Sequence, residues 1–417
     1  MIHFERKILS NGLTVIAHQD VSTPLVAVNI AYDVGSRDED PARTGFAHLF
    51  EHLMFSGSKN VADFDDPLQR AGGENNAYTT PDYTTFYEIL PLENIETALW
   101  LESDRMLALN ISKKEFEVQR KVVVEEFKET CLNEPYGDMW HHLNAMVYPE
   151  HPYRWPVIGL TPEHIEQATL KEVREFYKKW YTPANAVLCI AGNLSAQESF
   201  SLAEKWFGDI PGGSKPQRKM PALPAQTAPL YKEIEADVPV PALFLAFRMP
   251  ARLAPDFYVI DLLSDILAQG HSSRLYRRLF KEQQLFSQID AYVTASTEPG
   301  LFVVEGRPVA GVSIEQALEA IWKELELLKN TLIEPRELSK ILNRFENNVV
   351  FSEISALSKA QNLAYYEVLD KAELINEEVA TYLAVTPAEL QRCAREYLRP
   401  ENAATLVYKP KKESAAA

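Results

Sequence analysis

The chain repeats one pattern of helix-capping and turn residues near the end of each of its halves. The pattern consists of Thr169, Glu172, Pro183, Asn185 and Ala186, and it recurs at one constant offset as Thr386, Glu389, Pro400, Asn402 and Ala403. Thr followed three residues later by Glu is a capping box that begins a helix, and Pro-x-Asn-Ala predicts a turn that leads into a strand. Five matches could arise by coincidence in cap and turn chemistry; otherwise they indicate a fold built twice.

A proline-rich segment divides the chain into parts of similar length, which agrees independently with a duplication. Residues 211–229 hold a cluster of prolines and two adjacent glycines, a composition typical of a linker between domains. A length of 417 residues also favours two or three domains over one. We therefore predict an N-terminal domain over residues 1–210, a linker over 211–229 and a homologous C-terminal domain over 230–417.

Local patterns in the first half alternate between strands and helices. Strand-like sequence occupies residues 13–33, 76–80, 83–90 and 186–191. Helical patterns occupy residues 92–110, 113–130 and 169–180. The loop over residues 35–41 separates the first strands from a short helix that carries the most informative motif of the chain.

That motif is H-x-x-E-H, formed by His48, Glu51 and His52. Residues at i, i+3 and i+4 share one face of a helix, so the two imidazoles can bind one metal ion while the carboxylate reaches its water. The order inverts H-E-x-x-H and is that of the inverzincins. The alternative is a surface helix whose histidines are incidental. Aligning Gly57 with Gly270 sets other residues opposite the triad: Asp261, Ser264 and Asp265.

A catalytic zinc site needs a third protein ligand and one open position. The helical segment 113–130 contains the adjacent acids Glu125 and Glu126 beside an apolar run of valines. Only one of two adjacent helical residues can face inward, and spacing alone does not choose between them.

The composition limits the classes of partner. The net charge of -17 and a pI near 5.1 argue against nucleic acid and against an anionic membrane surface, and favour a cationic peptide, although solubility explains the charge equally well. Three scattered cysteines suggest neither disulfides nor a thiolate metal site. The charged N-terminus lacks an apolar signal core, and no apolar run reaches roughly 20 residues. We expect a soluble cytoplasmic protein, or a periplasmic one if a signal was removed.

Several segments together resemble the pitrilysin family of zinc peptidases, which includes insulin-degrading enzyme and the mitochondrial processing peptidase. They are residues 45–55 around the triad, Asn76-Ala77-Tyr78-Thr79, Val123-Val124-Glu125-Glu126, Gly159 and residues 181–187. The resemblance spans nearly the whole chain. Within that family, the chain resembles the H-x-x-E-H subunit of bacterial two-subunit and mitochondrial processing peptidases.

The resemblance implies a fold and a complete ligand set. The fold is α+β, with two homologous domains that each contain a mainly antiparallel sheet covered by helices, and a chamber closed between four such domains. The metal is one zinc ion per chain, with Glu126 as the third ligand beside His48 and His52. An acid that the family carries two helical turns before this ligand is Gln119 here.

The expected activity is that of a zinc metalloendopeptidase. Zinc lowers the pKa of its bound water to about 7 and polarises the peptide carbonyl, while Glu51 takes the water proton and returns it to the leaving amine. An extended substrate should add a strand at the edge formed by Asn76, Ala77 and Tyr78. An ordinary turn cap is the alternative role for Asn76.

The second half departs from the family where self-sufficient members carry an Arg and a Tyr, because Phe280 and Ser287 stand at those places. Loss of one such oxyanion donor costs about 10²–10³ in rate. We therefore expect a hetero-oligomer in which a related subunit supplies the pair; a self-sufficient homodimer is the less favoured assembly. Arginines close by could substitute, but a solvated helix face is their simpler explanation: Arg274, Arg277 and Arg278.

A non-catalytic scaffold or peptide-binding subunit of a larger complex is the main alternative function. The intact triad argues against it, since a scaffold needs neither the histidines nor Glu51. His141, His142 and His151 are expected in loops and caps rather than in a second metal site. The tail Lys409-Pro410-Lys411-Lys412 is expected to be disordered.

Overall fold

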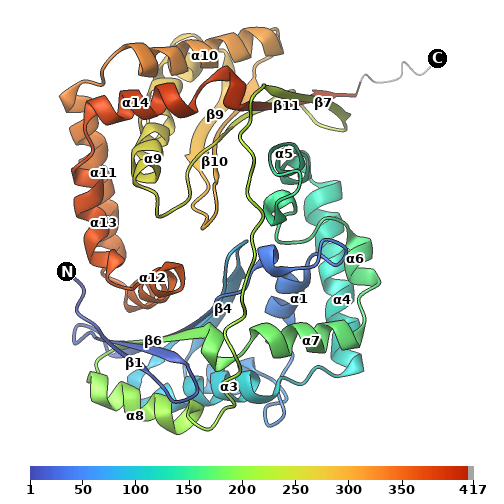
Figure 1. The fold of residues 1–417 in the computed structure, drawn as a ribbon, viewed down its shortest axis with the longest axis vertical. Coiled ribbons are helices and arrows are strands. Elements are labelled where there is room, and N and C mark those ends of the chain that lie inside the picture. The colour runs from blue at the N-terminus through green and yellow to red at the C-terminus, as the bar shows by residue number, and fades with distance from the viewer. Residues whose placement is uncertain (412–417) are drawn as a thin grey trace. The chain divides into compact units, whose positions relative to one another are not determined.

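The computed structural model of the chain describes residues 1–411 and contains two compact units (Figure 1). The first unit comprises Met1–Glu129, Trp155–Met220 and Asn348–Glu378. The second comprises Thr130–Arg154, Pro221–Asn347 and the chain from Val379 onward. Each unit is discontinuous in sequence, so neither coincides with one half of the chain.

The first unit is built on a sheet that is six-stranded within the described residues, in the order β1-β2-β6-β3-β5-β4. The strands are β1 (Glu5–Ile8), β2 (Thr14–Gln19), β3 (Leu25–Tyr32), β4 (Glu74–Thr79), β5 (Thr84–Pro91) and β6 (Ala186–Gly192). Only β2 and β6 run parallel; the other neighbours are antiparallel. β4 is an edge strand that pairs with β5 alone.

Helices cover both faces of this sheet because its central strands are apolar on both sides. The helices of the unit are α1 (Phe46–Leu53), α2 (Asp65–Arg70), α3 (Ile95–Ala108), α4 (Lys113–Phe127), α6 (Pro162–Glu166), α7 (Leu170–Trp180), α8 (Ala196–Phe207) and α12 (Ala356–Leu369). On β3, Val26, Val28 and Ile30 face the core shared with α1, α3 and α8. The alternate residues Ala27 and Ala31 face α12, where small side chains let a helix lie close to the strands (Figure 1).

The second unit repeats this plan with a sheet in the order β7-β11-β8-β10-β9, five-stranded within residues 1–411. Its strands are β7 (Leu230–Ala236), β8 (Ala242–Arg248), β9 (Phe286–Val293), β10 (Leu301–Pro308) and β11 (Ala403–Pro410). Its helices are α5 (Met139–Val147), α9 (Pro255–Ala268), α10 (Ile314–Asn330) and α14 (Pro387–Tyr397). The boundary between the units falls within α11 (Pro335–Ser352) and α13 (Leu374–Leu383).

The two sheets share one strand topology, which confirms the predicted fold class. Removing β1 from the first order leaves five strands that match the second order one by one, including the single parallel pair in each. The repeated turn is also the same in detail: Asn185 Nδ2 donates to the carbonyl oxygens of Asp33 and Trp180, and Asn402 Nδ2 donates to those of Arg248 and Tyr397. This Asn holds the end of a helix against a neighbouring strand in each unit.

One feature of the fold had no signal in the sequence: each half contributes a helix to the other unit. α5 comes from the N-terminal half but packs on the second sheet, through Leu143 and Val147. α12 comes from the C-terminal half but packs on the first sheet, through Ala360 and Leu363. The predicted boundaries at 1–210 and 230–417 therefore stay a prediction about domains, and the compact units depart from them at these two segments.

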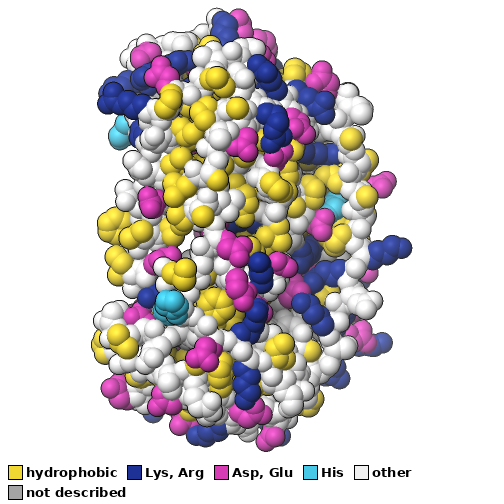
Figure 2. Space-filling model, turned by 60° about the vertical axis from the view of Figure 1, so that its left-hand side comes forward, with side chains coloured by type: hydrophobic (Ala, Val, Ile, Leu, Met, Phe, Trp, Pro, Cys, Tyr) yellow, Lys and Arg dark blue, Asp and Glu magenta, His cyan; other side chains and the backbone are white. Residues whose placement is uncertain are grey.

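Two smaller expectations were wrong. Lys409 and Pro410 belong to β11 and are not a disordered tail, because they pair with Glu235 and Ala236 of β7; Lys412 lies outside the described residues. His141 and His142 lie within α5 and not in loops or caps, whereas His151 lies in a loop as expected. Among residues 1–411, no helix combines the length and the apolar character needed to cross a bilayer. On the face shown in Figure 2, acidic and basic side chains are interspersed among hydrophobic ones.

A buried ion pair fastens α12 to the first sheet and yields a prediction about stability. Lys359 Nζ lies 2.5 Å from Asp20 Oδ2, and the side chains are 11% and 6% exposed. Burial alone would raise the pKa of Asp20, but hydrogen bonds from Lys359 and Ser22 outweigh it and lower the pKa to about 2. This value is below that of an unfolded Asp, about 3.9. The pair therefore adds stability above about pH 4 that is lost as the pH falls towards 2.

We expect Lys359→Met to lower the free energy of unfolding by roughly 1–3 kcal/mol at pH 7, because it leaves a buried carboxylate without its charged donor. Urea denaturation followed by circular dichroism at several pH values measures this, and the variant should lose part of the stability change between pH 4 and 2. Lys171→Met is the control, because the Lys171–Glu175 pair is exposed and 3.8 Å apart. Equal effects of the two substitutions would contradict the role of the α12 contact.

Candidate metal centre

α1 presents the H-x-x-E-H motif on one face because its other face is taken up by the core. Leu49, Phe50 and Leu53 are buried against the first sheet and its helices. His48 and His52 lie one turn apart on the remaining face, and their side chains are 12% and 25% exposed. The apolar stripe therefore determines the direction in which the polar groups point.

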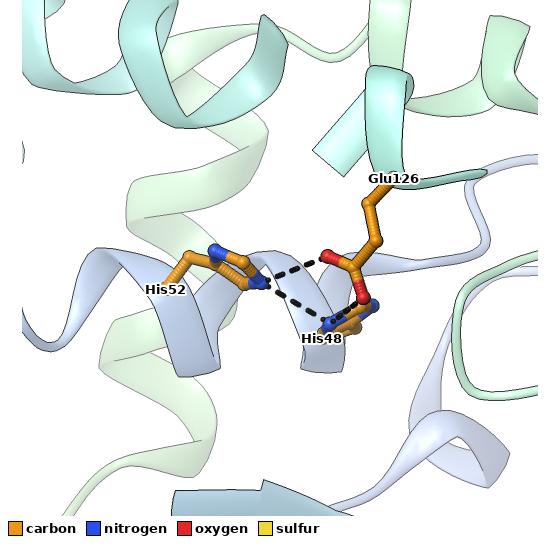
Figure 3. Close-up of side chains that lie close together, drawn as sticks. All are labelled: His48, His52 and Glu126. Atoms are coloured by element: carbon orange, nitrogen blue, oxygen red, sulfur yellow. Dashed lines mark hydrogen bonds and ion pairs between the residues drawn. The ribbon is translucent and has the colours of Figure 1, made fainter. Parts of the chain in front are cut away.

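Glu126 of α4 meets the two histidines from the opposite side (Figure 3). Its Oε1 lies 3.5 Å from His48 Nε2, and its Oε2 lies 3.3 Å from His52 Nε2. Glu125 instead pairs with Lys128 at 2.7 Å, and its side chain is 71% exposed. The choice that spacing left open is therefore made by the packing of α4 against α1, which turns Glu126 inward.

The separations between these atoms fit a tetrahedral zinc site. His48 Nε2 and His52 Nε2 are 3.2 Å apart, so the three candidate ligand atoms are 3.2, 3.3 and 3.5 Å from one another. Ligands at about 2.0–2.1 Å from one zinc ion at tetrahedral angles would be about 3.3 Å apart. Within residues 1–411, this is the group of three His, Cys, Asp or Glu side chains found close enough to hold a metal ion.

The local electrostatics favour the protonation states that a metal site needs. Burial lowers the pKa of His48, although the nearby Glu126 carboxylate acts in the opposite direction. The hydrogen bond with His52 lowers the pKa of Glu126. Neutral imidazole and ionised carboxylate are the forms in which these groups coordinate zinc.

Glu51 lies beside the histidines and is held by a residue that the predicted site omitted. Thr79 Oγ1 on β4 donates a hydrogen bond to Glu51 Oε2 at a distance of 2.6 Å. Strand alternation puts Ala77 and Thr79 on one face of β4, so Thr79 is the member of the Asn76–Thr79 motif that can reach α1. The sequence motif Asn76–Thr79 already included this threonine, but only the tertiary structure pairs its hydroxyl with Glu51.

The predicted substrate residues lie on the edge strand next to α1. Asn76, Ala77 and Tyr78 all belong to β4, and β4 contacts α1. Asn76 therefore lies in a strand and does not cap a turn. One edge of β4 pairs with β5, and its other edge carries no strand of the described chain.

The second unit carries different groups at the equivalent helix. α9 follows the central strand β8 as α1 follows β3, and it carries Asp261, Ser264 and Asp265. Tyr382 donates its hydroxyl to Asp261 Oδ2 at 2.5 Å. Burial raises the pKa of Asp265 to about 6. Two acids therefore replace the imidazoles here. Asp261 accepts a hydrogen bond from Tyr382, and burial shifts Asp265 towards its neutral form.

Phe280 and Ser287 provide neither a cation nor a phenol. Phe280 stacks on Tyr276 within a π-helical segment, Tyr276–Glu282, with ring centroids 4.9 Å apart. Ser287 is exposed on β9, where its hydroxyl donates to the carbonyl oxygen of Arg307. The arginines close by have acidic partners of their own: Arg274 with Glu337, Arg278 with Glu324 and Arg277 with Glu282.

Comparison with known proteins places this geometry in a family. The protein-family model described as Insulinase (Peptidase family M16) matches residues 14–159. A second family model, described as Peptidase M16 inactive domain, matches residues 167–345. The chain is 30% identical over 415 residues to the zinc protease PqqE of Helicobacter pylori, covering 96% of this chain and 92% of the relative.

Two further relatives extend the comparison. A probable mitochondrial-processing peptidase subunit beta of Schizosaccharomyces pombe is 28% identical over 317 residues, which cover 72% of this chain and 68% of that protein. The crystal structure of a protease from Helicobacter pylori superposes with a TM-score of 0.92 at 28% identity, covering 98% of this chain and 100% of the other. The chain therefore belongs to the M16 family of peptidases, the insulinase and pitrilysin family that its motifs resemble.

Proposed function

We propose that the chain is a zinc metalloendopeptidase subunit that binds one zinc ion through His48, His52 and Glu126. The observation that carries this proposal is the spacing of the three candidate ligand atoms, 3.2 to 3.5 Å, with Glu51 beside them on the same helix. The name zinc protease borne by a relative that spans nearly the whole chain supports the same function.

In this proposal each group of the site has one role. Bound zinc supplies a Lewis acid for the peptide carbonyl and lowers the pKa of a water molecule to about 7. Glu51 would accept a proton from the attacking water and return it to the leaving amine. Thr79 donates a hydrogen bond to Oε2 of Glu51. The carboxylate is thereby oriented before substrate arrives.

The substrate is an extended peptide that adds a strand to β4. Main-chain N–H and C=O groups on the outer edge of β4 bind the peptide backbone, and Asn76, Ala77 and Tyr78 line that edge. Because β4 also carries Thr79, the strand that binds the peptide holds the catalytic base as well. This arrangement suits an enzyme that recognises the peptide backbone more than the side chains. In this proposal the peptide is cleaved within a closed chamber.

The chain works with a second, related subunit that supplies an Arg and a Tyr to the active site. Phe280 has no hydrogen-bond donor, the hydroxyl of Ser287 donates to the carbonyl oxygen of Arg307, and Arg274 and Arg278 are engaged by Glu337 and Glu324. The similarity to a protein named as one subunit of a processing peptidase supports this assembly. A homodimer and a non-catalytic scaffold subunit remain the competing proposals.

The first prediction concerns metal binding, and adjacent residues provide a matched pair of variants. Glu126→Gln should weaken zinc affinity by more than about 100-fold, which exceeds the usual cost of losing an outer-shell partner. Glu125→Gln should leave it unchanged, because Glu125 faces away and pairs with Lys128. Competition with a chromophoric chelator measures the affinity. Equal affinity in both variants would show that Glu126 is not a ligand.

The second prediction separates the catalytic base from the metal ligands. Glu51→Gln should retain one zinc per chain but lose about 10²–10⁴ in kcat on fluorogenic peptides, because the amide cannot accept the water proton. Zinc content by atomic absorption and initial rates on a peptide library provide the two measurements. Zinc bound without any Glu51-dependent cleavage, even when the related subunit is present, would favour the scaffold.

The third prediction concerns the partner. The isolated chain should cleave peptides about 10²–10³ times more slowly than the same chain recovered with its native partners, because one oxyanion donor contributes that factor. A tagged copy purified from its own cells, compared with the recombinant chain at equal zinc content, provides the test. Full activity of the isolated chain, unchanged when the partner is added, would instead support the homodimer.

A further inference from the structure

α1 begins without a capping side chain of its own. Its N-cap residue is Gly45, which has a φ of 90° and makes no side-chain hydrogen bond. A Cβ atom at Gly45 would lie 2.9 Å from the carbonyl oxygen of Ile158, and one at Gly159 would lie 3.1 Å from Gly45 Cα. Two chain segments therefore cross here too closely for any side chain, yet the first N–H groups of a helix need acceptors.

The carboxyl group of Glu39 supplies these acceptors from outside the helix. Its Oε2 accepts the N–H of Gly45 and its Oε1 accepts the N–H of Ala47, each at 2.8 Å, and Glu39 is only 6% exposed. Burial raises the pKa of Glu39 to about 8, although the two N–H donors oppose this effect. Both oxygens can accept these bonds whether or not the group is protonated. Ala47 immediately precedes His48.

The segment that carries Glu39, residues 33–45, is itself held by ion pairs; we term it the pre-helix loop. Arg37 contacts Asp82 at 2.8 Å and Asp33 at 3.2 Å, and all three side chains are about one-tenth exposed or less. Arg218, from the predicted linker, contacts Asp33 at 2.9 Å and Asp38 at 2.5 Å. Buried charges paired in this way are costly to separate, so the loop resists displacement.

The pre-helix loop also contacts the turn that follows β4. The N–H groups of Ser36 and Arg37 donate to the carbonyl oxygens of Thr80 and Pro81 at 3.3 and 3.0 Å. Thr79, which holds Glu51, immediately precedes this turn. One loop is therefore bonded both to the start of the helix that carries the two histidines and to the turn that directly follows the strand carrying Thr79.

We propose that Glu39 is a positioning residue of the metal centre, which sets the place of α1, and so of His48 and His52, relative to Glu126. This inference rests on the proposed function, since it concerns the same metal site. Gln in place of Glu39 would direct an amide NH₂ at an N–H of Gly45 or Ala47, which leaves a buried donor without an acceptor. The start of α1 must then move, and the ligand separations move with it.

The experiment uses the full chain and measures the metal site directly. Glu39→Gln should weaken zinc affinity by about tenfold or more, the range seen when a ligand loses its outer support. The visible spectrum of the Co²⁺-substituted chain should change in band position and intensity, because it reports ligand geometry. Glu39→Asp keeps the carboxylate but shortens its reach, so it should cause smaller changes in zinc affinity and in the cobalt spectrum. If Glu39→Gln does not fold, the result for Glu39→Asp tests the inference.

A matched control separates metal positioning from a general loss of helix capping. Glu198 caps α8 in the same unit, where its carboxylate accepts the N–H of Ser195 at 2.8 Å. Glu198→Gln should leave the affinity and the cobalt spectrum unchanged even if it lowers the unfolding temperature. Wild-type affinity and spectrum in the Glu39 variants would overturn the inference, whereas a wild-type chain that binds no metal would instead overturn the proposed function.

Discussion

The packing of the apolar stripe of α1 against the first sheet is the contact on which the rest of the site depends. Leu49, Phe50 and Leu53 are almost completely buried in the core. A helix of eight residues has little stability by itself, so tertiary burial determines both its existence and its rotation. Once the stripe faces the sheet, His48 and His52 can only face α4, where Glu126 lies. The arrangement of the candidate metal ligands is thus a consequence of how a hydrophobic surface is buried.

Three separate segments then complete what α1 alone cannot supply. α4 contributes the third candidate ligand, β4 contributes the hydroxyl that orients Glu51, and the pre-helix loop contributes the acceptors for the helix start. Each works through a short polar contact in a mostly buried setting, where an unpaired donor or acceptor costs about 1–3 kcal/mol. Such contacts permit few alternative arrangements of the side chains. They therefore keep the three candidate ligand atoms at separations that suit a metal ion.

The duplicated fold shows how one scaffold can carry two different sets of groups. Both sheets have the same strand order, and both keep the Asn that closes the helix-to-strand turn. α9 nevertheless presents aspartates where α1 presents imidazoles. The family model that matches the segment containing α9, residues 167–345, is described as an inactive domain. Core packing and turn chemistry preserve the architecture, so the polar residues on the helix face that points away from the core can differ without changing the fold.

The sequence predicted the duplicated fold, the main strands and helices, and the H-x-x-E-H motif. These depend on local rules: helix periodicity places His48, Glu51 and His52 on one face, and capping boxes mark where helices begin. The family resemblance implied Glu126 rather than Glu125, and the packing of α4 against α1 turns Glu126 towards the histidines. Only the tertiary structure pairs Thr79 with Glu51 and brings Glu39 to the start of α1. It also placed α5 and α12 on the sheets of the opposite halves. These contacts join residues far apart in the chain, and their geometry follows from how complete layers pack, which no local pattern encodes.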